Sequence, residues 1–324
     1  MRGDTPAHRV AILAVPPVKA FDVAMPQMVL GAAVREGRAL YEVRVCTADP
    51  GIPQDGGGLT LGFEHGLEAL SWADSVVIAG TEAREIDSRV LAAVRGAVEA
   101  GKRVAAICTG GFVLAGTGLL DGRAATTYWL HTTEFQISFP RVDLRRDVLF
   151  VEDGTLLTSA GAAAGIDLCL HLVRSDFGAA VATEVARAAV VGPFRPGGQP
   201  QIVATPLPAA RDVSLAATRA WALARLDTPL TLADLAAHSR TSVRTFTRRF
   251  RAETGGTPQR WLLDQRLHRA RQLLETTDLP LARIARDCGL GTPDSLRRHL
   301  VRHVGRTPSA YRALAAEKPR DRPK

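Results

Sequence analysis

Residues 104–114, which read VAAICTGGFVL, join an apolar strand-like run to an apolar helix-like run through Cys108, Thr109 and two glycines. A buried strand that turns sharply into a helix presents the side chain at the turn above the sheet, which is the local pattern of a nucleophile elbow. Cys108 is therefore a candidate nucleophile, and the helix amides that follow should lower the pKa of its thiol. A small buried core residue is the alternative interpretation of the same cysteine.

Strand-like and helix-like runs alternate around this turn. The strand-like runs cover residues 10–15, 41–46, 76–79, 104–107, 148–151 and 155–159. Between them, residues 88–100 carry apolar side chains at helical spacing, and an apolar helix is predicted from Gly161 to Val173. Strands that alternate with helices indicate βαβ units, so we expect a three-layer α/β domain with a parallel sheet that ends near Val191.

The length of 324 residues favours two domains, and the formal charge of +8 is unevenly divided between them. Residues 211–324 contain 23 Lys and Arg against 11 Asp and Glu, a net charge of +12, whereas residues 1–210 have a net charge of −4. Five prolines between positions 192 and 208 mark a boundary. The boundaries that we expect are an α/β domain over 1–195, a linker over 196–212, a second domain over 213–316 and a basic disordered tail over 317–324.

Composition and cysteine spacing exclude several classes of protein. No run of eighteen apolar residues is present, and the first residues lack the apolar core of a signal peptide, so we expect a cytoplasmic protein with no membrane partner. The four cysteines lie 62, 61 and 119 residues apart, without a C-x-x-C pair or a Cys/His cluster. We therefore expect neither a metal site nor a disulfide framework, and no cofactor.

The second domain contains a repeat with an offset of about 50 residues. Leu232 matches Leu281 and Leu235 matches Ile284 at an offset of 49, and Phe246 matches Leu296, Phe250 matches Leu300 and Trp261 matches Tyr311 at 50. Each copy predicts a short helix, a turn and a second helix, whose N-cap is Ser242 in the first copy and Thr292 in the second. Two helix-turn-helix units are therefore predicted, and a long helix over 261–274 should link them rigidly.

The second helix of each copy separates an apolar stripe from a polar face. Val243, Phe246 and Phe250 form the expected buried stripe of the first copy. The side chains that we expect to contact DNA are Arg244, Thr245, Thr247, Arg248, Asp294, Ser295, Arg297 and Arg298. Arg can bind guanine bidentately, and Ser and Thr can contact bases or phosphates. A solvated charged face would explain one such helix, but two copies in a segment of net charge +12 favour DNA binding in successive major grooves.

Segments of the first domain also carry a family resemblance. They are residues 107–110, 118–127, 159–161 and 165–168. These segments resemble the class I glutamine amidotransferase-like fold of the PfpI superfamily, whose hydrolytic members place a His directly after the elbow Cys and bring an acid from near the first strand toward the thiol. Here Thr109 stands in the His position, and Asp22 matches the acid position. The resemblance implies a ligand pocket lined by Asp22, Cys108, Thr109, Tyr128 and Trp129.

Each of these pocket residues also has a purely structural interpretation. Asp22 could be the N-cap of a helix that begins near Val23, and Tyr128 and Trp129 could pack on the sheet. His131 lies three residues after Tyr128, so it is a candidate catalytic base if the protein is an enzyme. A third hypothesis makes the pocket vestigial, so that the domain serves assembly alone.

Further segments of the second domain match a known DNA-binding family. They are residues 250–255, 257–258, 266–274, 284–290, 296–298 and 307–312. These segments resemble the AraC-type DNA-binding domain, although Leu290 and Leu300 stand where that family usually has Phe. Residues 193–199 also resemble a segment of two-domain regulators of this kind. Together the resemblances imply a bacterial AraC-family transcription regulator with an N-terminal class I glutamine amidotransferase-like domain.

The complete expectation combines both domains. The fold class is an α/β three-layer parallel-sheet domain, flavodoxin-like and class I glutamine amidotransferase-like, followed by an all-α domain with two helix-turn-helix units. The expected function is sequence-specific transcription regulation rather than catalysis. The expected partners are double-stranded promoter DNA, with which the protein would associate in the nucleoid, a small-molecule effector, a second copy bound through the N-terminal domain, and RNA polymerase as a candidate. The alternative is a Cys108-dependent hydrolase or amidase with an attached DNA-binding domain.

Overall fold

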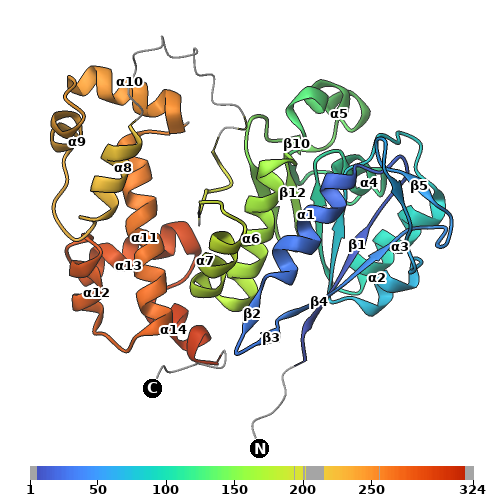
Figure 1. Cartoon of the computed structure of the whole chain (residues 1–324), viewed down its shortest axis with the longest axis horizontal. Helices are drawn as coiled ribbons and strands as arrows, with labels where there is room; N and C mark the ends of the chain where they lie inside the picture. The colour runs from blue at the N-terminus through green and yellow to red at the C-terminus, as the bar shows by residue number, and fades with distance from the viewer. Residues whose placement is uncertain (1–5, 193, 200, 202–214, 255, 318–324) are drawn as a thin grey trace, which may run out of the picture. The chain divides into compact units, whose positions relative to one another are not determined.

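The computed structural model describes residues 6–192, 194–199, 201, 215–254 and 256–317 (Figure 1). The described chain divides into two compact units, the first reaching to Val173 and including Val181–Gln201, and the second made of Arg174–Ala180 and residues 215–317. Of the expected linker over 196–212, residues 200 and 202–212 lie outside the described residues, and so does the expected tail after Glu317. Each unit buries apolar core clusters of its own.

The first unit is built on a sheet of six strands in the described chain. In spatial order they are β11 (Phe150–Asp153), β12 (Leu156–Ser159), β8 (Arg103–Ile107), β7 (Ser75–Ile78), β1 (His8–Leu13) and β4 (Tyr41–Cys46). Neighbouring strands are parallel, which confirms the expected sheet, except that β11 runs antiparallel to β12. The exception arises because the two strands are joined by a tight turn at Gly154, whose φ of 66° reverses the chain at once.

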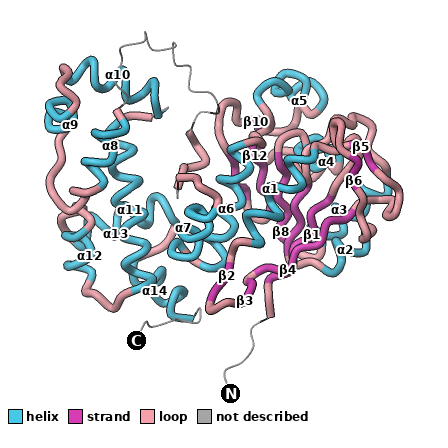
Figure 2. The backbone as a smooth tube through the Cα atoms, in the orientation of Figure 1, coloured by secondary structure: helices cyan, strands magenta, loops and turns pink. Residues whose placement is uncertain are grey.

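Helices cover both faces of this sheet, as the cartoon and the backbone tube show (Figures 1 and 2). The helices of the first unit are α1 (Ala20–Gly31), α2 (Glu68–Trp72), α3 (Ser88–Glu99), α4 (Gly110–Gly116), η1 (Trp129–His131), α5 (Thr132–Ser138), α6 (Ala163–Phe177) and α7 (Ala179–Ala188), of which α6 and α7 extend into residues 174–180. One face packs under α2, α3 and α4 around Leu13, Ile78 and Val104. Helices α1 and α6 lie together on the other face, where the sulfur atoms of Met25 and Cys169 are 4.0 Å apart. The expected three-layer architecture is confirmed.

Short two-residue strands lie outside the main sheet. They are β2 (Val34–Arg35), β3 (Arg38–Ala39), β5 (Gln54–Asp55), β6 (Thr60–Leu61), β9 (Ala124–Ala125) and β10 (Asp143–Leu144), which form three small pairs. Strand β9 lies just before the segment that carries Thr127 and Tyr128. Its pairing with β10 therefore helps to position one side of the turn at Cys108.

The turn after β8 brings three backbone segments into close contact. Cys108 has a φ of 56°, in the left-handed region that non-glycine residues seldom adopt. A Cβ on Gly110 would lie 2.6 Å from the carbonyl oxygen of Ile78, and a Cβ on Gly161 would lie 2.3 Å from the Cβ of Cys108. The expected strand-turn-helix at Cys108 is thus present, and its two neighbouring glycines are required by space.

The second unit is entirely helical over its described residues. Its helices are α8 (Ala216–Leu223), α9 (Leu232–His238), α10 (Val243–Thr254), α11 (Pro258–Thr276), α12 (Leu281–Asp287), α13 (Pro293–Val304) and α14 (Pro308–Glu317). Pairs α9/α10 and α12/α13 are the two helix-turn-helix units. The predicted caps are present, since the amide of Thr245 donates to Ser242 Oγ and the amide of Ser295 donates to Thr292 Oγ1, both at 3.2 Å.

Each helix-turn-helix unit has its own apolar core. Phe246 and Phe250 are buried in the first core and Leu296 and Leu300 in the second. Helix α11 contributes to both cores, as the predicted linking helix should. The prediction that Val243 belongs to the buried stripe is wrong, because Val243 is the first residue of α10, at the end of the stripe, and its side chain is 42% exposed.

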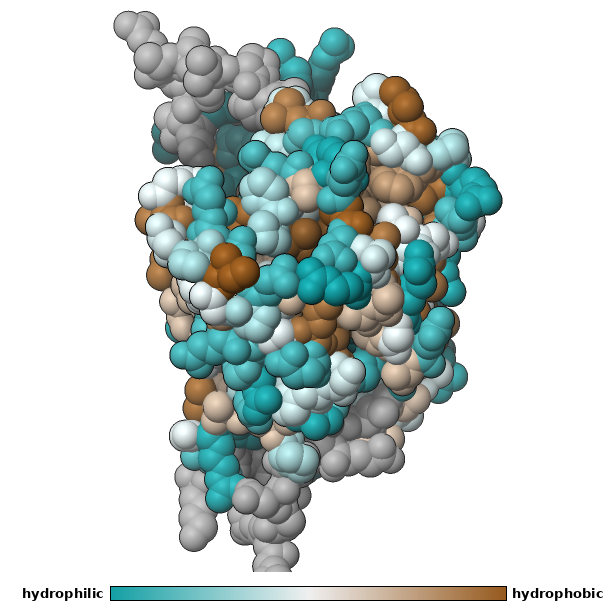
Figure 3. Space-filling view, turned by 90° about the vertical axis from the view of Figure 1, so that its right-hand side faces the viewer, coloured by the Kyte–Doolittle hydropathy of each residue, from teal (hydrophilic) through white to brown (hydrophobic). Residues whose placement is uncertain are grey.

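Exposed apolar side chains are scattered over the described surface. On the face drawn in Figure 3, hydrophobic residues occur in small groups among hydrophilic ones. The most exposed on the first unit include Ile52, Leu59, Leu130, Ile137 and Val190. Single exposed apolar residues of this kind are ordinary on protein surfaces. No helix in the described part of the chain is long and apolar enough to cross a membrane.

Two glycine-to-alanine substitutions in the first unit, one at the elbow and one on α3, should have opposite effects on stability. Gly110→Ala should lower the free energy of unfolding of the first unit by about 1–3 kcal/mol, because the added Cβ collides with the backbone of β7. Gly96→Ala in the middle of α3 should raise it by about 0.5–1 kcal/mol, because nothing lies within 4 Å of the added carbon. Urea titration of the full chain, read by hydrogen exchange of the β8 amides, measures both, and equal stability of the two variants would contradict this packing.

Candidate functional site

Cys108 and Asp22 form a buried polar pair at the carboxyl ends of the strands. Their residues are 6% and 3% exposed. Asp22 lies against Gly80 so closely that a Cβ there would be 2.1 Å from Asp22 Oδ2. Asp22 Oδ2 is buried and has no partner in good hydrogen-bond geometry, although the Cys108 thiol and the Gly80 amide lie close enough to lower the pKa of the carboxyl. Burial raises the pKa of the Asp22 carboxyl, against the opposing effect of the Lys19 ammonium. The structure therefore brings together the thiol and the acid that the sequence picked out.

The expectation of an acidified thiol is wrong. Burial, followed by the nearby Asp22 carboxyl, raises the pKa of the Cys108 thiol to about 11. Amides of the helix N-terminus favour a thiolate, but here the loss of solvation outweighs them. The N-cap hypothesis for Asp22 is also wrong, because α1 begins at Ala20 after Lys19, which places Asp22 inside the first turn.

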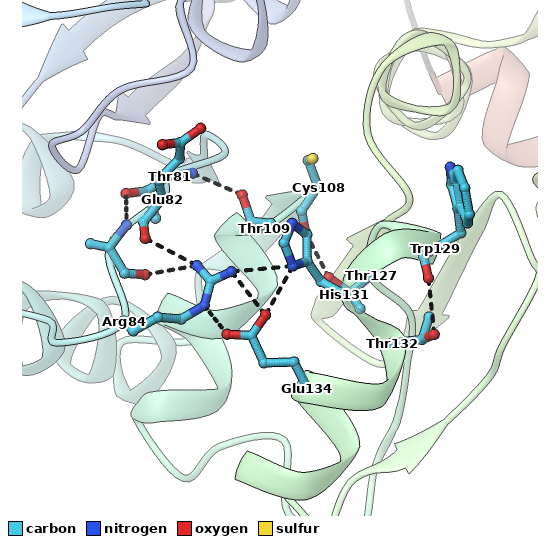
Figure 4. Close-up of polar contacts among 11 residues, drawn as sticks. Thr81, Glu82, Arg84, Cys108, Thr109, Thr127, Trp129, His131, Thr132 and Glu134 are labelled. Atoms are coloured by element: carbon cyan, nitrogen blue, oxygen red, sulfur yellow. Dashed lines mark hydrogen bonds and ion pairs between the residues drawn. The ribbon is translucent and has the colours of Figure 1, made fainter.

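Thr109 and Thr127 stabilise the turn at Cys108 through hydrogen bonds. Thr109 Oγ1 accepts a hydrogen bond from the amide of Thr81 at 3.0 Å, and Thr127 Oγ1 donates to the carbonyl oxygen of Cys108 at 3.1 Å (Figure 4). Thr109, Thr81 and Thr127 are all buried. Sequence reasoning missed Thr127 as a contact of the elbow, although it ends one of the segments that carried the family resemblance.

His131 is occupied by another set of partners. Its Nδ1 lies 2.9 Å from Glu134 Oε2 and 3.3 Å from Arg84 Nη2. Arg84 and Glu134 form an ion pair, and the Arg84 guanidinium holds the pKa of Glu134 at about 2. In Figure 4 the Cys108 sulfur points to the side opposite this group. The imidazole is therefore held by the Arg84 and Glu134 pair and not by the thiol.

The Lys19 ammonium acts on both members of the pair, and the Tyr128 ring lies beside Lys19. Tyr128 is half-buried, whereas Trp129 is 44% exposed, and their ring centroids are 6.0 Å apart. The Lys19 ammonium lies 5.8 Å from the centroid of the Tyr128 ring, within the range of a cation–π contact. We refer to Lys19, Asp22, Cys108 and Tyr128 as the Cys108 site. It offers a carboxyl, an ammonium and an aromatic face, which are groups for recognition. Lys19 had no signal in the sequence.

The residues expected at the DNA lie on the second helix of each unit. Arg244, Arg248, Asp294, Arg297 and Arg298 are exposed, and Thr245, Thr247 and Ser295 are half-buried. The Thr247 hydroxyl donates to the carbonyl oxygen of Val243 at 2.8 Å, and the Thr245 hydroxyl accepts from Ser242 Oγ at 3.0 Å. The arginine side chains are thus the ones with most freedom to reach a ligand. Within the described residues, no group of three His, Cys, Asp or Glu side chains is arranged to hold a metal ion.

Comparison with known proteins agrees with both units. The DJ-1/PfpI family model matches residues 8–175, and a helix-turn-helix domain model matches residues 235–314. The HTH-type transcriptional regulator CdhR of Pseudomonas aeruginosa is 33% identical over 279 residues, which cover 85% of this chain and 82% of that protein. The HTH-type transcriptional regulator ArgR of the same species is 30% identical over 290 residues, which cover 88% of this chain and 87% of that protein.

A solved structure supports the fold of the first unit. The AraC family transcriptional regulator from Pseudomonas putida has a TM-score of 0.51 and 19% identity, and the match covers 56% of this chain and 99% of that chain. Likeness at this identity concerns the fold alone. The family models and the full-length relatives decide the assignment: this chain belongs to the AraC-type helix-turn-helix transcriptional regulators that carry an N-terminal DJ-1/PfpI domain.

Proposed function

We propose that this regulator binds a small effector at the Cys108 site of its first unit, and that this binding controls how the second unit binds promoter DNA. Two observations carry the proposal: a buried Asp22 carboxyl oxygen has no partner in good hydrogen-bond geometry, and the second helices of both helix-turn-helix units expose arginine. A buried acceptor without a hydrogen bond favours binding of a ligand that can donate one. Association of two copies through the first unit, and contact with RNA polymerase, belong to the same proposal.

The second unit would use its exposed arginines for sequence recognition. Arg244 and Arg248 project from α10, and Arg297 and Arg298 project from α13, each within the first half of its helix. In helix-turn-helix proteins the N-terminal residues of the second helix contact base edges in the major groove. The net charge of +12 in residues 211–324 adds attraction to phosphate that does not depend on sequence.

Sensing is favoured over catalysis at the Cys108 site. A cysteine nucleophile needs a base within hydrogen-bond reach, but the imidazole of His131 is engaged by Glu134 and Arg84, and Thr109 follows Cys108 where hydrolytic relatives are expected to have His. The raised pKa also keeps the Cys108 thiol protonated near neutrality. The hydrolase alternative therefore lacks an activated thiol and a histidine base, and the Asp22 carboxyl beside the thiol raises the pKa of Cys108 instead of lowering it.

Substitution of the exposed arginines should weaken operator binding. Arg244→Ala or Arg297→Ala should each cost about 1–3 kcal/mol, roughly a 5- to 150-fold loss of affinity, and relax preference at one base pair if the arginine reads a base. Genomic capture of DNA bound by the tagged protein supplies the operator, and fluorescence anisotropy at fixed salt supplies the affinities. Arg141→Ala on the first unit removes the same charge and should have little effect. If no promoter shows protected bases in footprints at moderate salt, the regulator proposal is wrong.

Alkylation of Cys108 should depend steeply on pH. With a pKa of about 11, only about one thiol in ten thousand is ionised at pH 7, so the alkylation rate should rise about tenfold per pH unit between pH 8 and pH 10. Asp22→Asn should speed alkylation at pH 8, because the negative charge that opposes the thiolate is removed. Mass spectrometry after iodoacetamide treatment measures the rate, with Cys108→Ala as the control. A rate that levels off below pH 8, together with turnover of amides, would favour the hydrolase.

A further inference from the structure

The last described residues of the first unit, just before the 202–214 segment, are bound to the edge of the sheet. We call Arg195–Gln199 and Gln201 the strap. The carbonyl oxygen of Gly197 accepts hydrogen bonds from the amides of Leu149 at 2.7 Å and Phe150 at 3.2 Å, and that of Gln199 accepts from Leu149 at 3.0 Å. A Cβ on Gly197 would lie 2.6 Å from the carbonyl oxygen of Phe150, so glycine permits this approach. The strap is therefore hydrogen-bonded to the chain at the start of edge strand β11.

The side chain of Gln201 links the strap to the elbow. Its Nε2 donates to the carbonyl oxygen of Thr127 at 3.0 Å and to Thr126 Oγ1 at 3.3 Å. Thr127 Oγ1 in turn donates to the carbonyl oxygen of Cys108 at 3.1 Å. Both threonines are fully buried, so solvent does not compete for these bonds. Two consecutive hydrogen-bonded steps thus connect the strap to the residue at the centre of the Cys108 site.

The other end of the strap is fixed by a partly buried ion pair. Arg195 Nη2 lies 2.9 Å from Asp167 Oδ2, and Arg195 Nε donates to both carboxyl oxygens at 3.1–3.2 Å. The Asp167 side chain is only 8% exposed. Asp167 lies on α6, which begins two residues after Gly161, the residue packed against Cys108. Both ends of the strap are therefore attached to segments that frame the Cys108 site.

We propose that the strap couples the Cys108 site to the chain that continues toward the DNA-binding unit, so that a bound effector changes the attachment of the strap. Tyr128 of the Cys108 site is the chain neighbour of Thr127, so a ligand that shifts Tyr128 also shifts the oxygen that holds Gln201. Coupling of this kind is reciprocal, so release of the strap also alters the site. The inference rests on the proposed function, because it assigns a regulatory role to the same site.

The amides of Leu149 and Phe150 report the state of the strap, because they donate to its carbonyl oxygens. In the full chain, labelled at alkaline pH where the thiolate is populated, Cys108 attacks the S–CH3 sulfur of methyl methanethiosulfonate, forms a mixed disulfide and releases methanesulfinate. The added S–CH3 group fills part of the site without requiring the natural effector. Exchange of these two amides should then become roughly tenfold faster, and dithiothreitol should restore it. Cys108→Ala treated in the same way should not respond. Unchanged exchange at both amides after complete labelling of Cys108 would overturn the proposal.

Variants along the hydrogen-bonded path test the route. Gln201→Leu should give fast exchange at Leu149 and Phe150 with or without the label, because its side chain no longer holds the strap. Gln54→Leu is the matched control, since the Gln54 side chain bonds the carbonyl oxygen of Ile52 and not the strap. Thr127→Val, which keeps the shape but loses the hydroxyl, should also weaken the response, and Thr127→Ser should preserve it. A labelled Gln201→Leu chain that behaves like the labelled original would refute the route.

DNA binding measured on the same samples separates the two proposals. Methylthiolation should change the affinity of the original chain for its captured operator by roughly fivefold or more, and should leave the affinity of Gln201→Leu unchanged. If the chain binds no promoter while the amide response is present, the proposed function fails and the strap coupling stands. If operator binding is normal but labelling alters neither the amides nor the affinity, the strap proposal alone fails.

Discussion

The close approach of backbone segments around Cys108 constrains the whole first unit. Gly110 lies against carbonyl oxygens at the end of β7, Gly161 lies against Cys108, and Gly80 lies against the carboxyl of Asp22, each at a distance that admits no further carbon atom. Cys108 keeps its positive φ because these contacts fix the turn on every side. The same contacts bring α1, β8 and the segment before α6 together. The candidate site therefore depends on the packing of these segments at the end of the sheet.

The layered fold could be predicted from sequence because apolar spacing is a local signal. The run at 41–46 is typical of a strand and the spacing at 88–100 is typical of a helix. The repeat at offsets 49 and 50 predicts two copies of one helical unit. The antiparallel β11 could be anticipated as one arm of a hairpin but not as an exception to the sheet. Helical spacing places Val243 on the apolar stripe, but spacing alone does not show that Val243 begins the helix, where the side chain is exposed.

The electrostatics of the site could not be read from sequence. A cysteine before a helix suggested an acidified thiol, yet burial and a carboxyl from a helix almost ninety positions away raise its pKa to about 11. Desolvation depends on every neighbour in space, and Cys108 is reached by Lys19 and Asp22 from the start of α1 and by Thr127 from the segment after β9. The list of DNA-contacting residues and the domain boundaries stay predictions.

Helix α11 contributes Trp261 to the core of the first helix-turn-helix unit and Leu267, Ala270 and Leu274 to the core of the second. One rigid element therefore fixes both the distance and the angular phase between α10 and α13, the two helices that we propose contact DNA. One added base pair rotates the far half of a DNA site by about 35°, since a turn holds about 10–10.5 base pairs. Promoters of such a regulator can accordingly vary by base substitution within each half-site, whereas insertions or deletions between the half-sites would be selected against.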